Sequence, residues 1–480
     1  MLASEAFPYA KTGGLADVLA ALPEALAALG VEVTVILPAY RDARRVAGAV
    51  ERVGRVRAPI SSHLEPAEVL RVVDARVPTL LLDAPRYFDR DGLYGQGSAD
   101  YPDNAERFAF FCRAALEWLR LLGTPPDIVH CHDWQTALAP VMLRATAALY
   151  PELRRTRLVQ TVHNLAYQGI FPADTWHLLN LDPRYFAADA LEFHGTINFL
   201  KGGLAFADML TTVSPRYARE IQTPEFGEGL DPLLRQRAGR VHGILNGIDY
   251  RVWSPAVDAA LPARYDVGDL EGKAVCKADL QARLGLRIDS GAPLFAIVSR
   301  LAWQKGIDVA LDALWPVIEQ SAVQLVVLGM GEPDLERRLG ELTIRFPDRV
   351  AVRSSMDEPL AHRIVAGADL FLMPSRYEPC GLSQLYSLRY GTVPVVHATG
   401  GLVDTVGDVD DPQSERTGFT FSPCTPEALR ATLDRALTLR RDARAWRALQ
   451  ENGMRQDFSW ARSAQTYGAE YAALLAGPSD

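Results

Sequence analysis

The sequence predicts an α/β protein built from two doubly wound, mainly parallel sheets. Its 480 residues exceed the roughly 250–300 over which a single hydrophobic core usually grows. Short apolar runs alternate with amphipathic stretches, which is typical of parallel strands joined by helical crossovers. This alternation stops near residues 244–255 and then starts again, which indicates a second domain.

The apolar runs of the first half are expected to form buried strands. They cover residues 31–37, 80–82, 127–131, 158–162 and 209–213. Between them, residues 104–122 place apolar side chains at helical spacing, which predicts an amphipathic helix.

The second half repeats the pattern. Strands are expected over residues 293–299, 324–329, 350–353, 369–374 and 393–397, and helices over 307–320, 332–346 and 382–390. The tail, 459–475, carries Trp460, Tyr467, Tyr471 and Leu474 on one side of a helix. We therefore predict an N-terminal domain over 1–248, a C-terminal domain over 249–458, and a last helix within 459–480 that crosses back onto the first domain.

The composition excludes several classes of molecule as expected partners of this protein. Lys and Arg number 50 against 59 Asp and Glu, and the net charge of −9 argues against sequence-independent binding of nucleic acid. The five cysteines are widely spaced with no C-x-x-C pair, which argues against a disulfide framework or a zinc site and fits a reducing compartment. No apolar run approaches the ~18–20 residues of a membrane span. We expect a cytoplasmic protein with no membrane or nucleic-acid partner.

The first candidate site is a glycine pair before a helix. Lys11-Thr12-Gly13-Gly14 precedes the apolar stretch 16–29. Glycines let the backbone approach an anion closely, and the N-terminus of a helix favours negative charge. A plain glycine turn explains the same pattern equally well.

Histidines follow two of the predicted strands. His130 and His132 project to the same side of a strand that ends before Asp133. No third ligand cluster accompanies them, so a polar cleft wall is favoured over a metal site. His163 and Asn164 end the next strand and have the right groups to bind sugar hydroxyls, although a loop histidine satisfied by its neighbours is the alternative.

Two cations and a carboxylate stand out in the second half. Arg300 and Lys305 lie on a strand–loop–helix junction, where they either converge on a diphosphate or form two solvated surface cations. Glu378 lies in a turn between a strand ending at Pro374 and a helix starting near Gly381. An ionised carboxylate only accepts hydrogen bonds, so it suits sugar hydroxyls.

A further turn, Thr399-Gly400-Gly401, precedes another helix and is able to present N–H groups to phosphate or sugar oxygens. No G-x-G-x-x-G follows a predicted strand, which disfavours a dinucleotide oxidoreductase.

The motifs described above belong to a series of seven segments that follow one another in the chain: KTGGLADV, HCHDW, TVHNLAYQG, LNGID, SRLAWQKG, PSRYEPCGL and TGGL. Taken together and in this order, they resemble the ADP-glucose-dependent glycogen and starch synthases, which are retaining enzymes of glycosyltransferase family 5. The resemblance spans essentially the whole chain. It implies the GT-B fold, in which two Rossmann-like domains face a deep interdomain cleft. It also implies transfer of glucose from ADP-glucose to glycogen or a malto-oligosaccharide, with no metal and no cofactor beyond the donor substrate.

The resemblance also implies residue roles. Lys11, Arg300 and Lys305 would contact the phosphates of the donor, and His163, Asn246 and Glu378 would hold its glucosyl group. The catalytic set would be Glu378, Lys305, Arg300 and His163. The binding set would be Lys11, Gly13, Gly14, Asp17, Asp133, Asn164, Asn246, Met356, Cys380, Gly381, Thr399, Gly400 and Gly401.

The chain departs from the family pattern at three places. Only residues 1–3 precede Ser4-Glu5, so the first strand is expected to be short. Met356 stands where the family usually has a tyrosine against the base, and Tyr386 stands where many related transferases have a second glutamate. A UDP-glucose-using enzyme acting on a small acceptor is therefore one alternative. A catalytically silent glucan-binding homologue is another, disfavoured by the retained Lys11, Arg300, Lys305 and Glu378.

Overall fold

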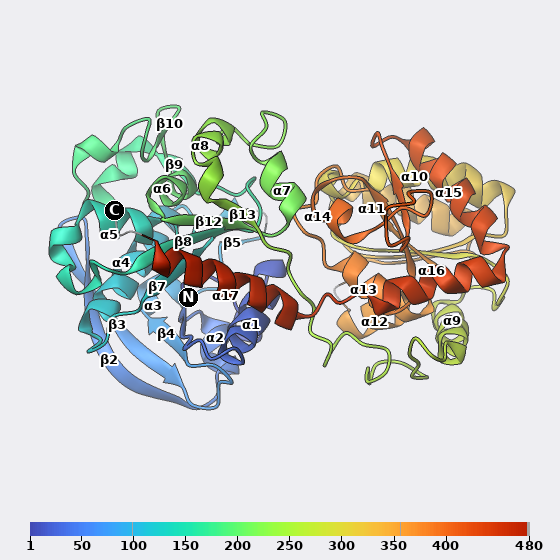
Figure 1. The fold of residues 1–480 in the computed structure, drawn as a ribbon, viewed down its shortest axis with the longest axis horizontal. Helices are drawn as coiled ribbons and strands as arrows, with labels where there is room; N and C mark the ends of the chain where they lie inside the picture. Colours follow the sequence, from blue (N-terminus) through green and yellow to red (C-terminus); the bar gives the residue numbers. More distant parts are fainter. Residues whose placement is uncertain (98, 356, 478–480) are drawn as a thin grey trace. The chain divides into compact units, whose positions relative to one another are not determined.

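The computed structural model describes residues 1–97, 99–355 and 357–477. The chain divides into two compact units (Figure 1). Unit 1 comprises Met1–Asn246 and the C-terminal segment that begins at Trp460, and unit 2 comprises Gly247–Ser459. Each unit contains a largely parallel sheet with helical crossovers, which confirms the predicted fold class.

The parallel strands of unit 1 form two groups that the first residues of the chain connect. They are β1 (Val35–Pro38), β4 (Thr79–Asp83), β7 (Ile128–His132), β8 (Arg157–Val162), β12 (Met209–Thr212) and β13 (Val241–Gly243). Leu2 pairs in parallel with Ile36 of β1 on one side and with Cys131 of β7 on the other. Residues 1–3 form only a short segment, but through Leu2 they bridge the two halves of the sheet.

An antiparallel extension of this sheet was not predicted. The strands β2 (Val50–Ile60) and β3 (His63–Val72) form a hairpin whose second strand pairs with β4. Charged side chains, including Arg52, Arg55 and Glu68, alternate with buried ones, so no continuous apolar run marks the hairpin. Smaller ladders join β5 (Gly95–Gln96) to β6 (Ala99–Asp100), and join β11 (Thr196–Asn198) to β9 (Ile170–Pro172) on one side and to β10 (Glu192–Phe193) on the other.

Helices cover the sheet of unit 1. They are α1 (Gly14–Ala27), α2 (Arg41–Val46), α3 (Pro85–Phe88), α4 (Asn104–Leu121), α5 (Leu138–Ala145), α6 (Phe199–Phe206), α7 (Pro215–Glu220), α8 (Asp231–Gln236) and α17 (Trp460–Ala476). The last of these, α17, packs against α1 (Figure 1). Its Trp460, Tyr467 and Tyr471 are buried there, so the C-terminal segment completes the core of unit 1.

Unit 2 has a fully parallel sheet in the order β16-β15-β14-β17-β18-β19. The strands are β14 (Leu294–Val298), β15 (Gln324–Leu328), β16 (Val350–Arg353), β17 (Leu370–Met373), β18 (Val393–His397) and β19 (Phe419–Phe421). In chain order this arrangement is 3-2-1-4-5-6, the doubly wound order, and its direction reverses between β14 and β17. Ligands of such sheets bind outside the carboxyl ends of the strands at this switch point.

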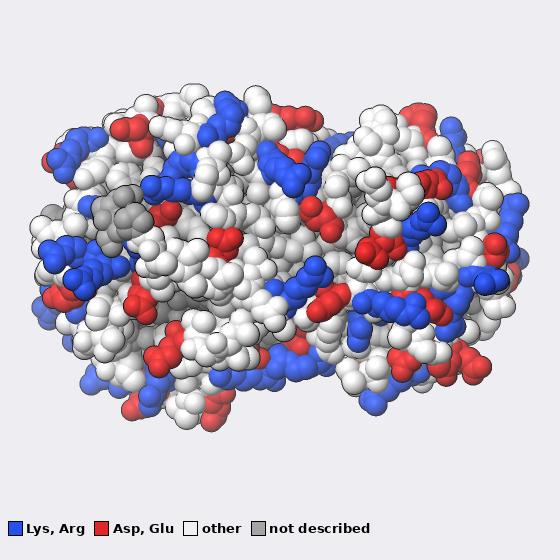
Figure 2. Space-filling view, viewed as in Figure 1, with Lys and Arg blue, Asp and Glu red and all other residues white. Residues whose placement is uncertain are grey.

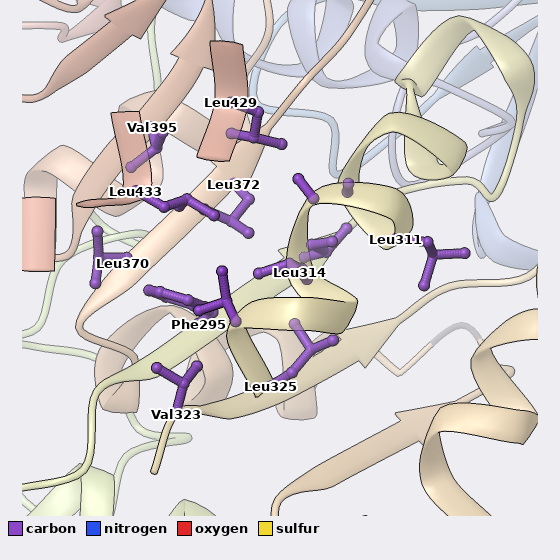
Figure 3. Packing of buried hydrophobic residues seen from close by; sticks show 14 of the residues in the cluster. Phe295, Leu311, Leu314, Val323, Leu325, Leu370, Leu372, Val395, Leu429 and Leu433 are labelled. Carbon is purple, nitrogen blue, oxygen red and sulfur yellow. The ribbon is translucent and has the colours of Figure 1, made fainter. Parts of the chain in front are cut away.

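The helices of unit 2 are α9 (Glu271–Leu284), α10 (Ile307–Gln320), α11 (Pro333–Arg345), α12 (Glu358–Gly367), α13 (Ser383–Arg389), α14 (Gly400–Thr405), α15 (Pro426–Arg440) and α16 (Ala443–Arg455). On one face of the sheet, strand residues such as Phe295 and Leu372 pack against Leu314 of α10 and Leu433 of α15 (Figure 3). A second buried cluster includes Ile364 of α12. Because both faces are covered, the strands are continuous apolar runs, as predicted.

Charges of both signs are interspersed on the surface in view (Figure 2). Many are paired locally, as Arg345 is with Glu319 at 2.6 Å. Across the described ranges, none of the helices has the length and apolarity that crossing a membrane requires.

Candidate active site

A lysine and a glutamate meet at the switch point of unit 2. Lys305 follows β14 in a 3-10 turn, and Glu378 follows the neighbouring strand β17. Lys305 Nζ lies 2.7 Å from Oε2 and 2.9 Å from Oε1 of Glu378. The side chain of Glu378 is 7% exposed and that of Lys305 is 19% exposed, so the ion pair is largely removed from water. The structure therefore joins two residues that the sequence placed in separate motifs.

Neighbouring loops hold Glu378 in place. Ser375 Oγ donates a hydrogen bond to Glu378 Oε2 at 2.8 Å, and the N–H of Gly401 donates to the main-chain oxygen of Glu378 at 3.0 Å. Cys380 and Thr399 are buried beside these contacts. The Glu378 turn and the 399–401 turn are thus one assembly.

Close backbone approach at this assembly depends on glycine. Gly306 has φ +62°, and a Cβ there would lie 1.9 Å from the carbonyl oxygen of Pro374. A Cβ at Gly401 would lie 2.3 Å from the carbonyl oxygen of Cys380. Side chains at these two positions would force the β14, β17 and β18 loops apart.

The two arginines near Lys305 differ in their surroundings. Arg300 is exposed, and its Nη2 donates to Gln304 Oε1 at 3.4 Å. Arg376 instead forms a two-bond ion pair with Asp308, at 2.8 and 2.6 Å, and also donates to the main-chain oxygen of Trp303. Arg376 therefore holds the loop together, whereas Arg300 keeps its guanidinium accessible on the same loop.

In unit 1, a buried carboxylate organises the glycine turn. Glu5 accepts hydrogen bonds from the N–H and Oγ1 of Thr12, at 2.5 and 2.6 Å, and from the N–H of Gly13 at 3.3 Å. It also accepts one from Tyr94 Oη at 2.6 Å. The sequence leaves open whether this turn approaches a bound anion or is a plain glycine turn. In the structure the N–H of Gly13 donates to the internal carboxylate of Glu5.

The exposed part of the same turn carries a second ion pair. Lys11 Nζ lies 2.6 Å from Asp17 Oδ1, and both side chains are about one-third exposed. The same ammonium lies 5.5 Å from the centre of the Phe7 ring. Gly14 is the first residue of α1, so Lys11, Gly14 and Asp17 lie together around the start of that helix.

Three imidazoles form a row: His130 lies in the middle of β7, His132 ends β7, and His163 directly follows β8. The rings of His130 and His132 are stacked, with centres 4.1 Å apart. His132 Nδ1 lies 3.1 Å from Nε2 of His163, and His130 Nδ1 lies 2.6 Å from Tyr471 Oη of α17. Burial lowers the pKa of His163 to about 3 and lowers the pKa of His130 and of His132 well below the usual value. All three rings are therefore neutral at pH 7.

Asp133 fixes the backbone beside this row. It adopts a left-handed conformation with φ +56°, and its Oδ1 accepts the N–H of His163 at 2.7 Å. Burial raises the pKa of Asp133 to about 7, and the hydrogen bonds from the backbones of His163 and Asn164 partly oppose that rise. Asn164 closes a local turn, in which its Oδ1 accepts the N–H of Ala166 at 3.1 Å.

Asn246 ends unit 1 with a buried side chain. Its Oδ1 has no hydrogen-bond partner among the residues that the structure describes. Met356, the proposed neighbour of the base, lies outside the described residues. Within the described part of the chain, no group of three or more His, Cys, Asp or Glu side chains is placed to hold a metal ion.

Sequence reasoning missed Glu5, Ser375, Gln304 and Arg376. A signal existed for Ser375 and Arg376, which lie inside the PSRYEPCGL segment. Glu5 lies close to the first apolar residues of the chain, separated from them by Ser4, but its partner Tyr94 is distant in sequence.

Comparisons with known proteins cover both units. Residues 1–236 match the family model described as "Starch synthase catalytic domain", and residues 281–453 match "Glycosyl transferases group 1". The chain is 50% identical over 480 residues to "Glycogen synthase" of Myxococcus xanthus, covering 99% of both chains. It is 48% identical over 468 residues to "Glycogen synthase" of Syntrophotalea carbinolica, covering 97% of this chain and 96% of that one.

Two solved structures also match this chain over almost its whole length. The catalytic domain of starch synthase IV from Arabidopsis thaliana, bound to ADP and acarbose, matches with a TM-score of 0.90 and 35% identity over 99% of both chains. Sucrose-phosphate synthase from Thermosynechococcus elongatus matches with a TM-score of 0.62 and 20% identity over 99% of this chain and 98% of that one, which is a likeness of fold alone.

Proposed function

Because this chain belongs to the glycogen and starch synthase family of glucosyltransferases, we propose that it transfers glucose from ADP-glucose to the nonreducing end of an α-1,4-glucan, with retention of configuration. The acceptor is glycogen or a malto-oligosaccharide. The ADP and acarbose bound to the Arabidopsis relative support both the donor and the acceptor class. No cofactor is required beyond the donor itself.

The observation that carries the proposal is the buried ion pair of Lys305 and Glu378 at the switch point of unit 2. A buried pair costs desolvation energy that its mutual attraction often only balances, so stability alone does not explain it. A nucleotide-sugar brings a diphosphate for the cation and hydroxyls for the carboxylate. We therefore assign the donor to this assembly.

Lys305 and Arg300 have the charge that the reaction needs. Breaking the bond from sugar to phosphate leaves negative charge on the departing ADP. Positive groups held in a water-poor site stabilise such charge without reorganising. Lys305 is positioned by Glu378, and the accessible fork of Arg300 suits phosphate oxygens.

Glu378 binds and orients the sugar. A carboxylate offers about four acceptor positions. In the structure Lys305 occupies one on each oxygen and Ser375 a second on Oε2, which leaves one position on Oε1 for a sugar hydroxyl. A second position opens if Lys305 turns to the diphosphate. The carboxylate also favours positive charge that develops at the anomeric carbon.

We assign no nucleophile to the protein. The acceptor hydroxyl attacks on the face that the phosphate leaves, and the leaving phosphate accepts the proton of that hydroxyl. The new bond from the acceptor oxygen to the anomeric carbon replaces the bond to phosphate, so configuration is retained. The protein contributes by positioning and by charge.

The unit 1 residues are proposed as substrate contacts. The partnerless Oδ1 of Asn246 is available to accept a sugar hydroxyl, and Lys11 is a mobile cation for phosphate oxygens. His163 also contacts the glucosyl group. In unit 1 the proposed lining residues are Gly13, Gly14, Asp17, Asp133 and Asn164. In unit 2 they are Cys380, Gly381, Thr399, Gly400 and Gly401, and Met356 is the proposed neighbour of the adenine.

The test is incubation with radiolabelled ADP-glucose or UDP-glucose and glycogen, followed by linkage analysis of the product. We expect label in new α-1,4 linkages with ADP-glucose, and much less with UDP-glucose. Preference for UDP-glucose would contradict the donor assignment. Glycogen binding without any incorporation from either donor would indicate a catalytically silent homologue.

A further inference from the structure

The two ring nitrogens of His132 have different surroundings. Nδ1 lies 3.1 Å from Nε2 of His163. Nε2 is fully buried and has no hydrogen-bond partner within the described ranges. A neutral imidazole carries its proton on one nitrogen only, so this asymmetry bears on where the proton resides.

The hydrogen bond between His132 Nδ1 and His163 Nε2 contains one proton, which belongs to one of the two nitrogens while the other accepts it. Because both rings are neutral, each ring carries one proton in all, and two arrangements are possible. In the first arrangement His163 supplies the shared proton from Nε2. His132 then accepts at Nδ1 and carries its own proton on the buried Nε2, where no acceptor is available. In the second arrangement His132 supplies the proton from Nδ1, and its buried Nε2 is bare.

The second arrangement is favoured, because folded proteins leave very few buried N–H groups without an acceptor and tolerate an unfilled acceptor more often. We propose that His132 is a positioning residue that donates from Nδ1 to Nε2 of His163 and so holds His163 in the tautomer with its proton on Nδ1. This places a hydrogen-bond donor, not an acceptor, on the free nitrogen of His163.

The contacts around the pair hold the ring of His132 and the backbone of His163. His130 lies between Tyr471 Oη, at 2.6 Å, and Thr161 Oγ1, at 2.5 Å, and its ring stacks on that of His132. The backbone N–H of His163 is held separately by Asp133. The ring of His163 is held by its contact with His132, whose ring centre lies 5.3 Å away.

The tautomer limits what His163 can do. Its Nε2 lone pair is occupied by His132, and its Nδ1 is protonated, so no basic nitrogen remains to take a proton. Where the proposed glucosyl transfer holds, His163 acts as a hydrogen-bond donor to an oxygen of the substrate. It does not act as a general base toward the acceptor hydroxyl.

The direct test is a long-range proton–nitrogen NMR correlation on the full chain labelled with ¹⁵N-histidine, since protonated and bare ring nitrogens resonate far apart. His132→Asn and His163→Gln spectra assign the two rings. His397 supplies an internal reference, because its Nδ1 lies 2.8 Å from the carbonyl oxygen of Ser375 and must carry a proton there. We expect the same Nδ1-protonated pattern for His163. A proton on Nε2 of His163 would overturn the proposal whether or not the chain transfers glucose.

Two variants test the positioning role. Asparagine at 132 can place an amide N–H near the position of Nδ1, whereas leucine cannot. We expect His132→Leu to lower kcat/KM for ADP-glucose by roughly 10- to 100-fold, the scale of a misplaced contact, and His132→Asn to recover most of that loss. Melting temperatures check that both variants fold. Equal, near-wild-type kcat/KM in both folded variants would overturn the role, and loss of activity without rescue by asparagine would overturn the donor assignment.

Discussion

Lys305 Nζ lies within 3 Å of both carboxylate oxygens of Glu378, a residue 73 positions later in the chain. Each side chain is the main countercharge of the other in a largely buried place. A solvated surface cation was one of the two interpretations of Lys305 in the sequence, and the structure shows that its ammonium is instead mostly enclosed. A change at either residue therefore affects stability as well as turnover.

Lys305→Met should reduce both properties. It leaves the carboxylate of Glu378 buried with Ser375 as its remaining side-chain donor, and breaking a buried pair costs up to about 3–5 kcal/mol. Loss of the positive charge of Lys305, which is proposed to stabilise the departing ADP, should lower turnover by about 10²–10³. The double variant Lys305→Met/Glu378→Gln removes both charges, so its urea-unfolding midpoint should recover while turnover stays low. Equal stability of wild type and the single variant would show that the pair is not formed.

Glu378→Gln and Glu378→Ala separate two roles for the carboxylate. If it orients the sugar and stabilises positive charge, the glutamine variant should keep partial turnover and the alanine variant much less, with ADP affinity nearly unchanged. Turnover, ADP titration and melting temperature measure this. Equal inactivity of both, with rescue of the alanine variant by azide, would instead indicate a nucleophile.

Asp133→Asn should change the pH dependence of stability. Burial raises the pKa of Asp133 to about 7, above its usual value of 3.8, so the folded state holds the proton longer than the unfolded state. This contribution to stability is present below about pH 4 and is lost as the pH rises to about 7. Asparagine still accepts the N–H of His163 and tolerates the left-handed backbone.

The gain in melting temperature of Asp133→Asn over wild type should therefore be larger at pH 8 than at pH 4.5. A gain that does not vary with pH would show that Asp133 titrates normally. Asp133→Ala is the contrasting variant, since it loses both the acceptor and the side chain that suits φ +56°.

Gly306→Ala should disrupt the Lys305 loop. The new Cβ would lie 1.9 Å from a backbone oxygen of Pro374, and φ +62° is strained for alanine. We expect a loss of about 1–3 kcal/mol of stability together with lower turnover. Gly340→Ala is the matched control, because it lies within α11 with nothing within 4 Å of its Cβ. That change should stabilise by about 1 kcal/mol, measured by urea unfolding.

Glu5→Gln should loosen the turn that carries Lys11. The carboxylate accepts four hydrogen bonds, two from backbone N–H groups on Oε2 and two from hydroxyls on Oε1. In glutamine the amide nitrogen faces either the two N–H donors or the two hydroxyls, which must then accept instead of donating. We expect a loss of about 1–3 kcal/mol, against about 1 kcal/mol for Tyr94→Phe, which removes one of the four donors. Denaturant unfolding of the two variants checks the order. A smaller effect for Glu5→Gln than for Tyr94→Phe would contradict this account.

The sequence alone determined the class of fold and most of the candidate residues. Buried parallel strands are continuous apolar runs, so β14, β15, β17 and β18 were visible without any tertiary information. Glycine-rich turns at the ends of such runs, as at Gly306 and Gly401, mark places where loops approach one another closely. The β2–β3 hairpin escaped prediction because its solvent-facing residues are charged, which leaves no run to see.

Only the tertiary structure decided which of these residues meet. Whether Lys305 reaches Glu378 depends on β14 and β17 being neighbours in the sheet, and a crossover connection allows several strand orders. Likewise, the contact of His132 with His163 and that of Tyr94 with Glu5 require segments that are far apart in the chain to converge. Local patterns in a sequence specify helices, strands and turns. The order of the strands sets the distances between side chains, and these distances determine which ion pairs form and which atoms of the site carry protons.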